Sequence, residues 1–117
     1  MKYEHLFSKG KIGSLEVKNK VVMPAIGIGL SRGTFVTDET IAYYEERAKG
    51  GVGLIIIEAT RTNDDTGAAN PNQTSLTTDE HIAGLTRLTG AVHRHGAKIF
   101  AQLYHPGNQR SFNQARY

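Results

Sequence analysis

Residues 54–57 of the chain read Leu-Ile-Ile-Ile, an apolar run that no polar residue interrupts. Three of the four residues are β-branched, which favours a strand, and the lack of polar alternation is typical of a strand that is buried on both faces. Such strands occur in parallel sheets with helices around them. The run therefore predicts an α/β fold with parallel strands.

A helix and a shorter strand are predicted on the N-terminal side of this run. Thr37 is a good N-cap, the two acidic residues after it favour the positive end of the helix dipole, and the glycine pair at 50–51 ends the helix. Before the helix, residues 21–23 read Val-Val-Met and form a buried strand that Pro24 closes. The glycine-rich residues 27–33 are expected to form a loop.

A second helix and a third strand are predicted on the C-terminal side, after a long polar connection at residues 60–72. Thr77 and Glu80 have the spacing of a capping box, and Gly96 ends the helix that they begin. One stripe of this helix is apolar and should face the sheet; it contains Ile82, Leu85, Leu88 and Val92. Residues 99–103 read Ile-Phe-Ala-Gln-Leu and form the third strand.

The elements follow the order hairpin, β, α, β, α, β, in which residues 12–17 form the hairpin around a Gly-Ser turn. Two architectures begin in this way, the (β/α)8 TIM barrel and the doubly wound open sheet. Both keep their functional residues at the carboxyl ends of the parallel strands. In this chain those ends are residues 24–27, 58–60 and 102–105.

The composition is that of one globular domain. Of the 117 residues, 38% are hydrophobic and 21% are charged, and the longest apolar patch, residues 52–59, is far too short to span a membrane. The net charge of +3 lacks the dense basic stripe of a nucleic-acid-binding protein. Cysteine is absent and no apolar segment typical of a signal peptide follows the N-terminus, so a cytoplasmic location is expected.

The glycine run invites a dinucleotide-binding interpretation, because it follows a strand and Glu58 ends the next strand, where such folds keep their ribose-binding acid. In those folds the glycines, here Gly29 and Gly33, lead directly into the helix, so that its N-terminus meets the pyrophosphate. The cap at Thr37 instead lies four residues past Gly33, with bulky residues between. We therefore favour a simple loop and retain a small Rossmann-type NAD(P)-binding module as an alternative.

Three residues at the other strand ends are candidates for ligand binding. Gln102 offers an amide donor and a carbonyl acceptor that match a flavin pyrimidine edge, although a glutamine that satisfies local backbone is the more common case. Ala59 is small enough to let a planar ligand approach the backbone, and His105 can hydrogen-bond a ligand and titrate near neutral pH. No catalytic triad, carboxylate pair or metal-ligand spacing stands out. The remaining histidines are expected at the surface; they are His5, His81, His93 and His95.

Four segments carry a resemblance to a known family. They are residues 12–23 (IGSLEVKNKVVM), 43–56 (YYEERAKGGVGLII), 79–82 (DEHI) and 96–103 (GAKIFAQL). In order and spacing they resemble the Old Yellow Enzyme family of NADH:flavin oxidoreductases, and most closely the branch of 2,4-dienoyl-CoA, 2-enoate and bile-acid-type reductases. The similarity covers nearly all of residues 6–107.

The resemblance implies an N-terminal portion of a (β/α)8 TIM barrel, with residues 1–117 forming an incomplete FMN-binding oxidoreductase domain. In the family, NAD(P)H reduces FMN, which passes hydride to an alkene conjugated to a carbonyl, as in an enone or enoate. The implied flavin contacts are Pro24, Ala25, Ile26, Gly27, Ala59 and Gln102. His105 falls on a substrate-facing loop. In the family, the proton donors and the residues that bind the FMN phosphate come from later strands, so no catalytic residue is assigned in this chain.

Two positions depart from the family pattern. Many members have Ser-Pro or Ala-Pro where this chain has Pro24 followed by Ala25, and many read His-x-Gly-Arg where residues 105–108 read His-Pro-Gly-Asn. A TIM barrel also needs about 250 residues, more than this chain provides. A non-enzymatic alternative is therefore an inactive truncated fragment, or a partner that assembles with another chain.

Further partners follow from the same resemblance and from the composition. Iron–sulfur and FAD-binding parts follow the barrel in the larger family members and would lie downstream of this chain. A small-molecule substrate is expected, a homo-oligomer is compatible with the sequence, and neither nucleic acid nor a membrane is an expected partner.

Overall fold

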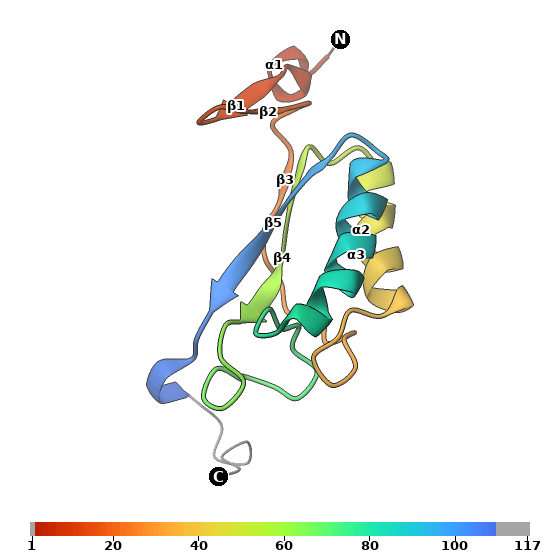
Figure 1. The fold of residues 1–117 in the computed structure, drawn as a ribbon. Coiled ribbons are helices and arrows are strands. Elements are labelled where there is room, and N and C mark those ends of the chain that lie inside the picture. The colour runs from red at the N-terminus through yellow and green to blue at the C-terminus, as the bar shows by residue number, and fades with distance from the viewer. Residues whose placement is uncertain (1, 110–117) are drawn as a thin grey trace.

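The structure, a computed structural model, describes residues 2–109. Figure 1 shows a small N-terminal unit at one end of a larger α/β unit. The small unit contains the helix α1 (Glu4–Phe7), which the sequence does not predict, and an antiparallel hairpin of β1 (Gly10–Ile12) and β2 (Leu15–Val17). The predicted hairpin is confirmed, and Gly13 supplies the positive φ (+58°) that its tight turn requires.

The larger unit contains a parallel sheet in the order β3-β4-β5, made of β3 (Val22–Met23), β4 (Leu54–Arg61) and β5 (Lys98–Tyr104). In the register of this sheet, Leu54 pairs with Val22 on one side and with Lys98 on the other. All three predicted strands are confirmed, but the prediction that the first is buried is wrong: Val22 is 46% exposed, because β3 lies at the edge of the described sheet. β4 continues past the apolar run as far as Arg61.

Two helices, α2 (Asp38–Lys49) and α3 (Ile82–His93), pack side by side against one face of this sheet (Figure 1). Tyr44 of α2 and Leu88 of α3 meet Ile55 of β4 in the core, and all three side chains are fully buried. Each such burial stabilises the fold by about 1.5–3 kcal/mol relative to leaving the side chain exposed. The core therefore lies between the sheet and the helix pair.

The ends of α2 follow the predicted capping chemistry. Thr37 is the N-cap, and its hydroxyl accepts a hydrogen bond from the backbone N–H of Thr40 (3.1 Å). Gly51, just past the helix, has a φ of +106°, which glycine adopts without a steric penalty. Two short 3-10 turns complete the unit: η1 (Asp79–His81) leads into α3, and η2 (Gly107–Gln109) follows β5.

Two predictions for α3 are wrong by a small shift along the chain. Thr78, not Thr77, precedes η1 as its cap, because the Thr77 hydroxyl donates instead to the carboxylate of Asp64 in the preceding loop. Ile82 is exposed rather than packed on the sheet. It is the first residue of α3, and the stripe that packs on the core begins one turn later, at Leu85.

A β-bulge in β4 sets which side chains stand next to each other at the end of the sheet. Ile57 pairs with Ala101 of β5, but the next pair joins Ala59 to Gln102, so Glu58 has no partner in the ladder. Side chains of paired residues project from the same face of a sheet. The bulge therefore places a small alanine beside Gln102. A regular register would place the Glu58 side chain there.

Candidate functional site

The carboxyl ends of β3, β4 and β5 lie at the same end of the parallel sheet (Figure 1). Ala59 and Gln102 are neighbours there, and the Gln102 side chain is exposed. Within residues 2–109 no hydrogen bond holds the Gln102 amide. Its donor and its acceptor can therefore both meet a ligand, and the methyl group of Ala59 leaves room for a flat one.

The segment after β3 presents a further surface at this end of the sheet. Pro24, Ile26 and Gly27 are exposed, and Ala25 is half-buried. A Cβ atom built on Gly27 would meet no other atom within 4 Å. There is therefore free space beside Gly27, and the flavin contacts of residues 24–27 stay a prediction. The glycine-rich stretch that follows is a loop, as predicted.

The Glu58 side chain joins this loop to β4. It is 2% exposed, and one carboxylate oxygen accepts hydrogen bonds from the backbone N–H groups of Ile28 (2.8 Å) and Gly29 (3.3 Å). The other oxygen accepts from the hydroxyl of Thr74 (2.9 Å), which lies 2.7 Å from the hydroxyl of Ser31. A carboxylate that is buried and bonded in this way is not presented to a ribose. The dinucleotide interpretation of Glu58 is therefore wrong.

The backbone of Glu58 is satisfied by side chains because the bulge removes it from the ladder. Its N–H donates to the hydroxyl of Tyr44 (2.9 Å), and its carbonyl accepts from the hydroxyl of Thr60 (2.8 Å). Tyr44 is 1% exposed, and this burial raises the pKa of its phenol far above the ordinary value, so the hydroxyl stays protonated. Buried backbone groups need such partners, and here they fix the bulge from both sides.

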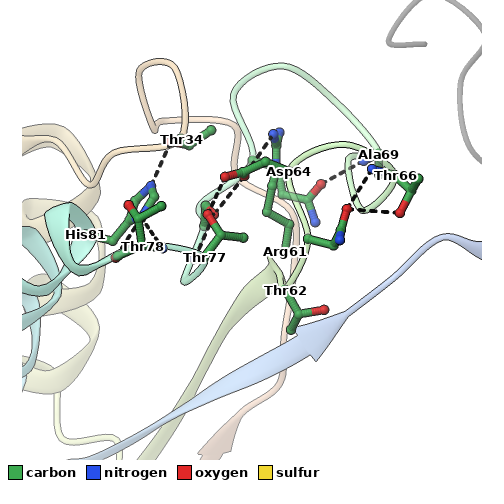
Figure 2. Close-up of polar contacts among 12 residues, drawn as sticks. Thr34, Arg61, Thr62, Asp64, Thr66, Ala69, Thr77, Thr78 and His81 are labelled. Carbon is green, nitrogen blue, oxygen red and sulfur yellow. Dashed lines mark hydrogen bonds and ion pairs between the residues drawn. The ribbon is translucent and has the colours of Figure 1, made fainter. Parts of the chain in front are cut away.

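Polar contacts also order the loop after β4, which Figure 2 shows in close-up. Arg61, buried at the end of β4, donates to the carbonyl of Asn70 (3.0 Å) and lies 3.8 Å from the carboxylate of Asp64. Asp64 also accepts hydrogen bonds from the hydroxyls of Ser75 (3.1 Å) and Thr77. The loop is thus held by side-chain hydrogen bonds and not by an apolar core. The Arg61 Nε is buried without a partner in the part of the chain that the structure describes.

His105 connects this loop to the one after β5. Its ring is exposed; Nδ1 accepts from the backbone N–H of Gly107 (3.0 Å), and Nε2 lies 2.9 Å from the hydroxyl of Thr66. Because Nδ1 accepts, the neutral ring carries its proton on Nε2 and donates it to Thr66. The Thr66 hydroxyl donates in turn to the side chain of Asn63 (3.0 Å). The ring is therefore held in one orientation.

The histidine predictions are confirmed for His5 and His93, which are exposed, and are wrong for His81. His81 is buried at the end of η1, where its Nε2 lies 2.9 Å from the hydroxyl of Thr34 (Figure 2). Its ring also stacks on that of Phe35, with the ring centroids 4.6 Å apart. The loop after β3 folds over the ring, a contact between residues far apart in the sequence. Within residues 2–109, no group of three His, Cys, Asp or Glu side chains is placed to hold a metal ion. None of the helices in this range has the length and apolar composition of a membrane-spanning helix.

Known proteins match both the sequence and the fold. The model of the NADH:flavin oxidoreductase / NADH oxidase family matches residues 5–116. The NADH oxidase of Thermoanaerobacter brockii is 42% identical over 108 residues, which cover 92% of this chain and 17% of that protein. A complex of 2-naphthoyl-CoA reductase with 2-naphthoyl-CoA matches with a TM-score of 0.89 at 30% identity, over 97% of this chain and 17% of that one. Old Yellow Enzyme from Pichia sp. matches with a TM-score of 0.78 at 31% identity, over 86% and 26%.

These matches decide between the two architectures that the element order left open. The solved neighbours are TIM barrels, and they match 86% and 97% of this chain. The three-stranded sheet is therefore part of a TIM barrel, as the family resemblance implies, and not of a doubly wound sheet. The chain spans between about a sixth and a third of the length of the curated relatives it matches.

Proposed function

The chain belongs to the NADH:flavin oxidoreductase / NADH oxidase family, and from this premise we propose that it supplies one wall of the FMN site of an ene-reductase. In this proposal residues 1–117 are the N-terminal part of an FMN-binding barrel domain. Bound FMN supplies hydride chemistry between NAD(P)H and an alkene conjugated to a carbonyl. The observation that carries the proposal is the pairing of Ala59 with an exposed Gln102 at the carboxyl end of the sheet.

The residues at the strand ends fit a flavin by their chemistry. The pyrimidine edge of a flavin offers an N–H donor between two carbonyl acceptors, and the Gln102 amide provides a complementary acceptor and donor. Ala59 lets a planar ring approach the backbone of β4. Residues 24–27 would line the ring from the β3 side, where Ile26 is an exposed apolar side chain. We assign these residues to binding and orientation, and none of them to proton transfer.

Two relatives support the reactants in this proposal. The Thermoanaerobacter protein is named for NADH, which supports a nicotinamide as the reductant. The structure with the TM-score of 0.89 holds 2-naphthoyl-CoA, a thioester whose carbonyl is conjugated to an aromatic ring. A substrate with an unsaturated carbon conjugated to a carbonyl, such as an enone or enoate, is the corresponding class for this chain.

We propose that His105 shapes the substrate side of this wall. The ring is exposed after β5, and its contacts with Thr66 and Gly107 hold it in one orientation. A ring with Nδ1 already accepting a backbone hydrogen bond suits packing or hydrogen bonding to a substrate. It is poorly arranged to deliver a proton.

The second candidate is that the chain is a fragment without catalytic activity of its own. For the isolated chain, the exposed face of the sheet favours this alternative. Leu103 is 66% exposed on β5, and Phe100 is also exposed, so apolar side chains of this strand have no cover within the described residues. An exposed apolar strand is an aggregation hazard. The isolated chain should therefore bind free FMN weakly or not at all, and fluorescence titration that shows submicromolar binding would refute this.

The proposed function is tested in the full-length protein with Gln102→Leu, and Gln109→Leu is the matched control. Gln109 is an exposed glutamine in η2. Loss of the two amide contacts should weaken FMN binding about 30-fold, since each hydrogen bond contributes roughly 1 kcal/mol. A parent protein that binds no FMN, or that fails to oxidise NAD(P)H with 2-cyclohexenone, would contradict the function. A Gln102→Leu protein that behaves like the control would contradict only the role of Gln102.

A further inference from the structure

We infer that Glu58 is a positioning residue that holds the segments of the flavin wall in one arrangement without touching the ligand itself. The inference rests on the proposed function, because it concerns the residues assigned there to FMN. Glu58 is adjacent to Ala59, and its side chain reaches the loop that begins with residues 24–27. Glu58 is bonded both to α2, through the Tyr44 hydroxyl, and to the β3 loop, through the N–H groups of Ile28 and Gly29.

The first step concerns the backbone of Glu58. As the extra residue of the bulge, it shifts the β4–β5 pairing so that Ala59 and not a longer side chain stands beside Gln102. The bulge persists because Tyr44 and Thr60 satisfy the N–H and C=O groups that leave the ladder. The position of the small residue in the wall therefore depends on this local departure from a regular strand.

The second step concerns the carboxylate. Its two oxygens accept three hydrogen bonds, from two consecutive N–H groups of the β3 loop at Ile28 and Gly29 and from Thr74. This loop has three residues with positive φ, Gly29 (+64°), Gly33 (+56°) and Thr34 (+101°), and forms no regular element. Without an acceptor, its N–H groups would be left unpaired in a part-buried site. Glu58 therefore sets where the flavin-contact segment just before Ile28 lies relative to β4.

The third step separates hydrogen bonding from charge. A glutamine at position 58 can accept both backbone N–H groups with its amide oxygen, while its NH2 group donates to the Thr74 hydroxyl. Thr74 then donates to Ser31, which reverses the direction of the hydroxyl chain and keeps every contact. A methionine has nearly the same length and no strong acceptor. If Glu58 acts by positioning, Glu58→Gln should preserve the wall and Glu58→Met should not.

The first experiment reads the loop without any flavin. Hydrogen–deuterium exchange on the full-length apoprotein should show that Glu58→Met speeds exchange at residues 28–29 by about tenfold or more, because two protected amides lose their acceptor. Glu58→Gln should exchange as the parent does. Glu46→Met, at an exposed position on α2, is the control for introducing a methionine. Unchanged exchange at residues 28–29 in Glu58→Met would overturn the inference.

The second experiment measures FMN affinity and the flavin absorption spectrum below the unfolding temperature of each variant. Glu58→Met should weaken FMN binding by roughly tenfold, the size of effect typical when a supporting residue is lost, and Glu58→Gln should restore it. A folded Glu58→Met protein with parental affinity overturns the inference while the proposed function stands. A parent that binds no FMN contradicts the function, and the exchange result then still reports on the loop.

A milder variant decides the matter if Glu58→Met does not fold. Thr74→Val removes one of the three donors to the carboxylate and the link to Ser31, and it keeps the shape of the side chain. Thr86→Val, at an exposed position on α3, is the matched control. Faster exchange at residues 28–29 together with weaker FMN binding, relative to the control, supports the inference. Parental values for both measurements overturn it.

Discussion

The hydroxyl of Tyr44 offers the sharpest test of the bulge. Tyr44→Phe removes the only hydrogen-bond acceptor that the described residues provide for the backbone N–H of Glu58, which lies 2.9 Å away. The aromatic ring remains, so its packing against Ile55 and Leu88 in the core is kept. The substitution thus isolates one hydrogen bond from the hydrophobic contribution of the same side chain.

The expected loss follows from burial. Tyr44 is 1% exposed and Glu58 is 2% exposed, so water does not replace the lost acceptor. Leaving a buried donor unpaired costs about 1–3 kcal/mol, whereas the net value of an average hydrogen bond is about 1 kcal/mol. The opening equilibrium of the Glu58 amide should therefore rise by roughly fivefold to 150-fold.

Hydrogen–deuterium exchange over residues 54–61 measures this change directly, and urea unfolding gives the accompanying loss of stability. Tyr43→Phe is the matched control, because Tyr43 precedes Tyr44, is half-buried and has no hydroxyl hydrogen bond within residues 2–109. Its ring also keeps the contact with Arg47 when the hydroxyl is removed. The control should change stability by less than about 0.5 kcal/mol. Equal effects of the two substitutions would refute the assignment of the Tyr44 hydroxyl to the bulge.

Three further predictions concern the helices and the loop after β4. Hydrogen bonds from His95 and from a neighbouring arginine lower the pKa of Glu45 below its ordinary 4.5. The stabilisation of the fold by the ionised Glu45 side chain is therefore complete above pH 4.5 and is lost as the pH falls through the lower pKa of the folded state. The stability difference between Glu45→Gln and the parent in urea should accordingly vanish in acid. Gly90→Ala should stabilise α3 by about 1 kcal/mol in urea unfolding, because a Cβ there meets open space; no gain would contradict this. Gly67→Ala should speed limited proteolysis of the loop, because its Cβ would lie 2.2 Å from the Asn63 carbonyl oxygen, and parental cleavage rates would count against it.

Local sequence signals were enough to predict the hairpin, the three parallel strands and the two long helices of this fold, but not α1. The Leu-Ile-Ile-Ile run identifies the central parallel strand, and Thr37 with the glycine pair at 50–51 bounds the helix before it. Each of these signals depends on residues a few positions apart, which is the range over which capping, turn formation and strand alternation act. The choice of a barrel over an open sheet was not available from these signals, since both begin with the same element order. The family resemblance implied the barrel, and the similarity to solved barrels confirms it.

Contacts between distant residues account for two of the predictions that failed. His81 is buried because Thr34 and Phe35 from another loop cover it. Thr77 does not cap the next turn because Asp64 binds its hydroxyl. In both cases the local pattern was compatible with the prediction, and a partner more than ten residues away changed the outcome. Spacing rules contain no term for such partners.

Glu58 shows how the same residue at a strand end can take opposite roles. An acid after the second strand of a dinucleotide fold faces the ligand, because the strand is regular and its last side chain points into the crevice. In this chain the bulge inserts Glu58 as an extra residue, so its carboxylate lies buried against the β3 loop and Ala59 takes the position beside Gln102. A bulge leaves no sequence signature here, since residues 54–61 read as an uninterrupted strand. The chemical identity of a strand-end residue therefore indicates a site only when the register of the ladder is known.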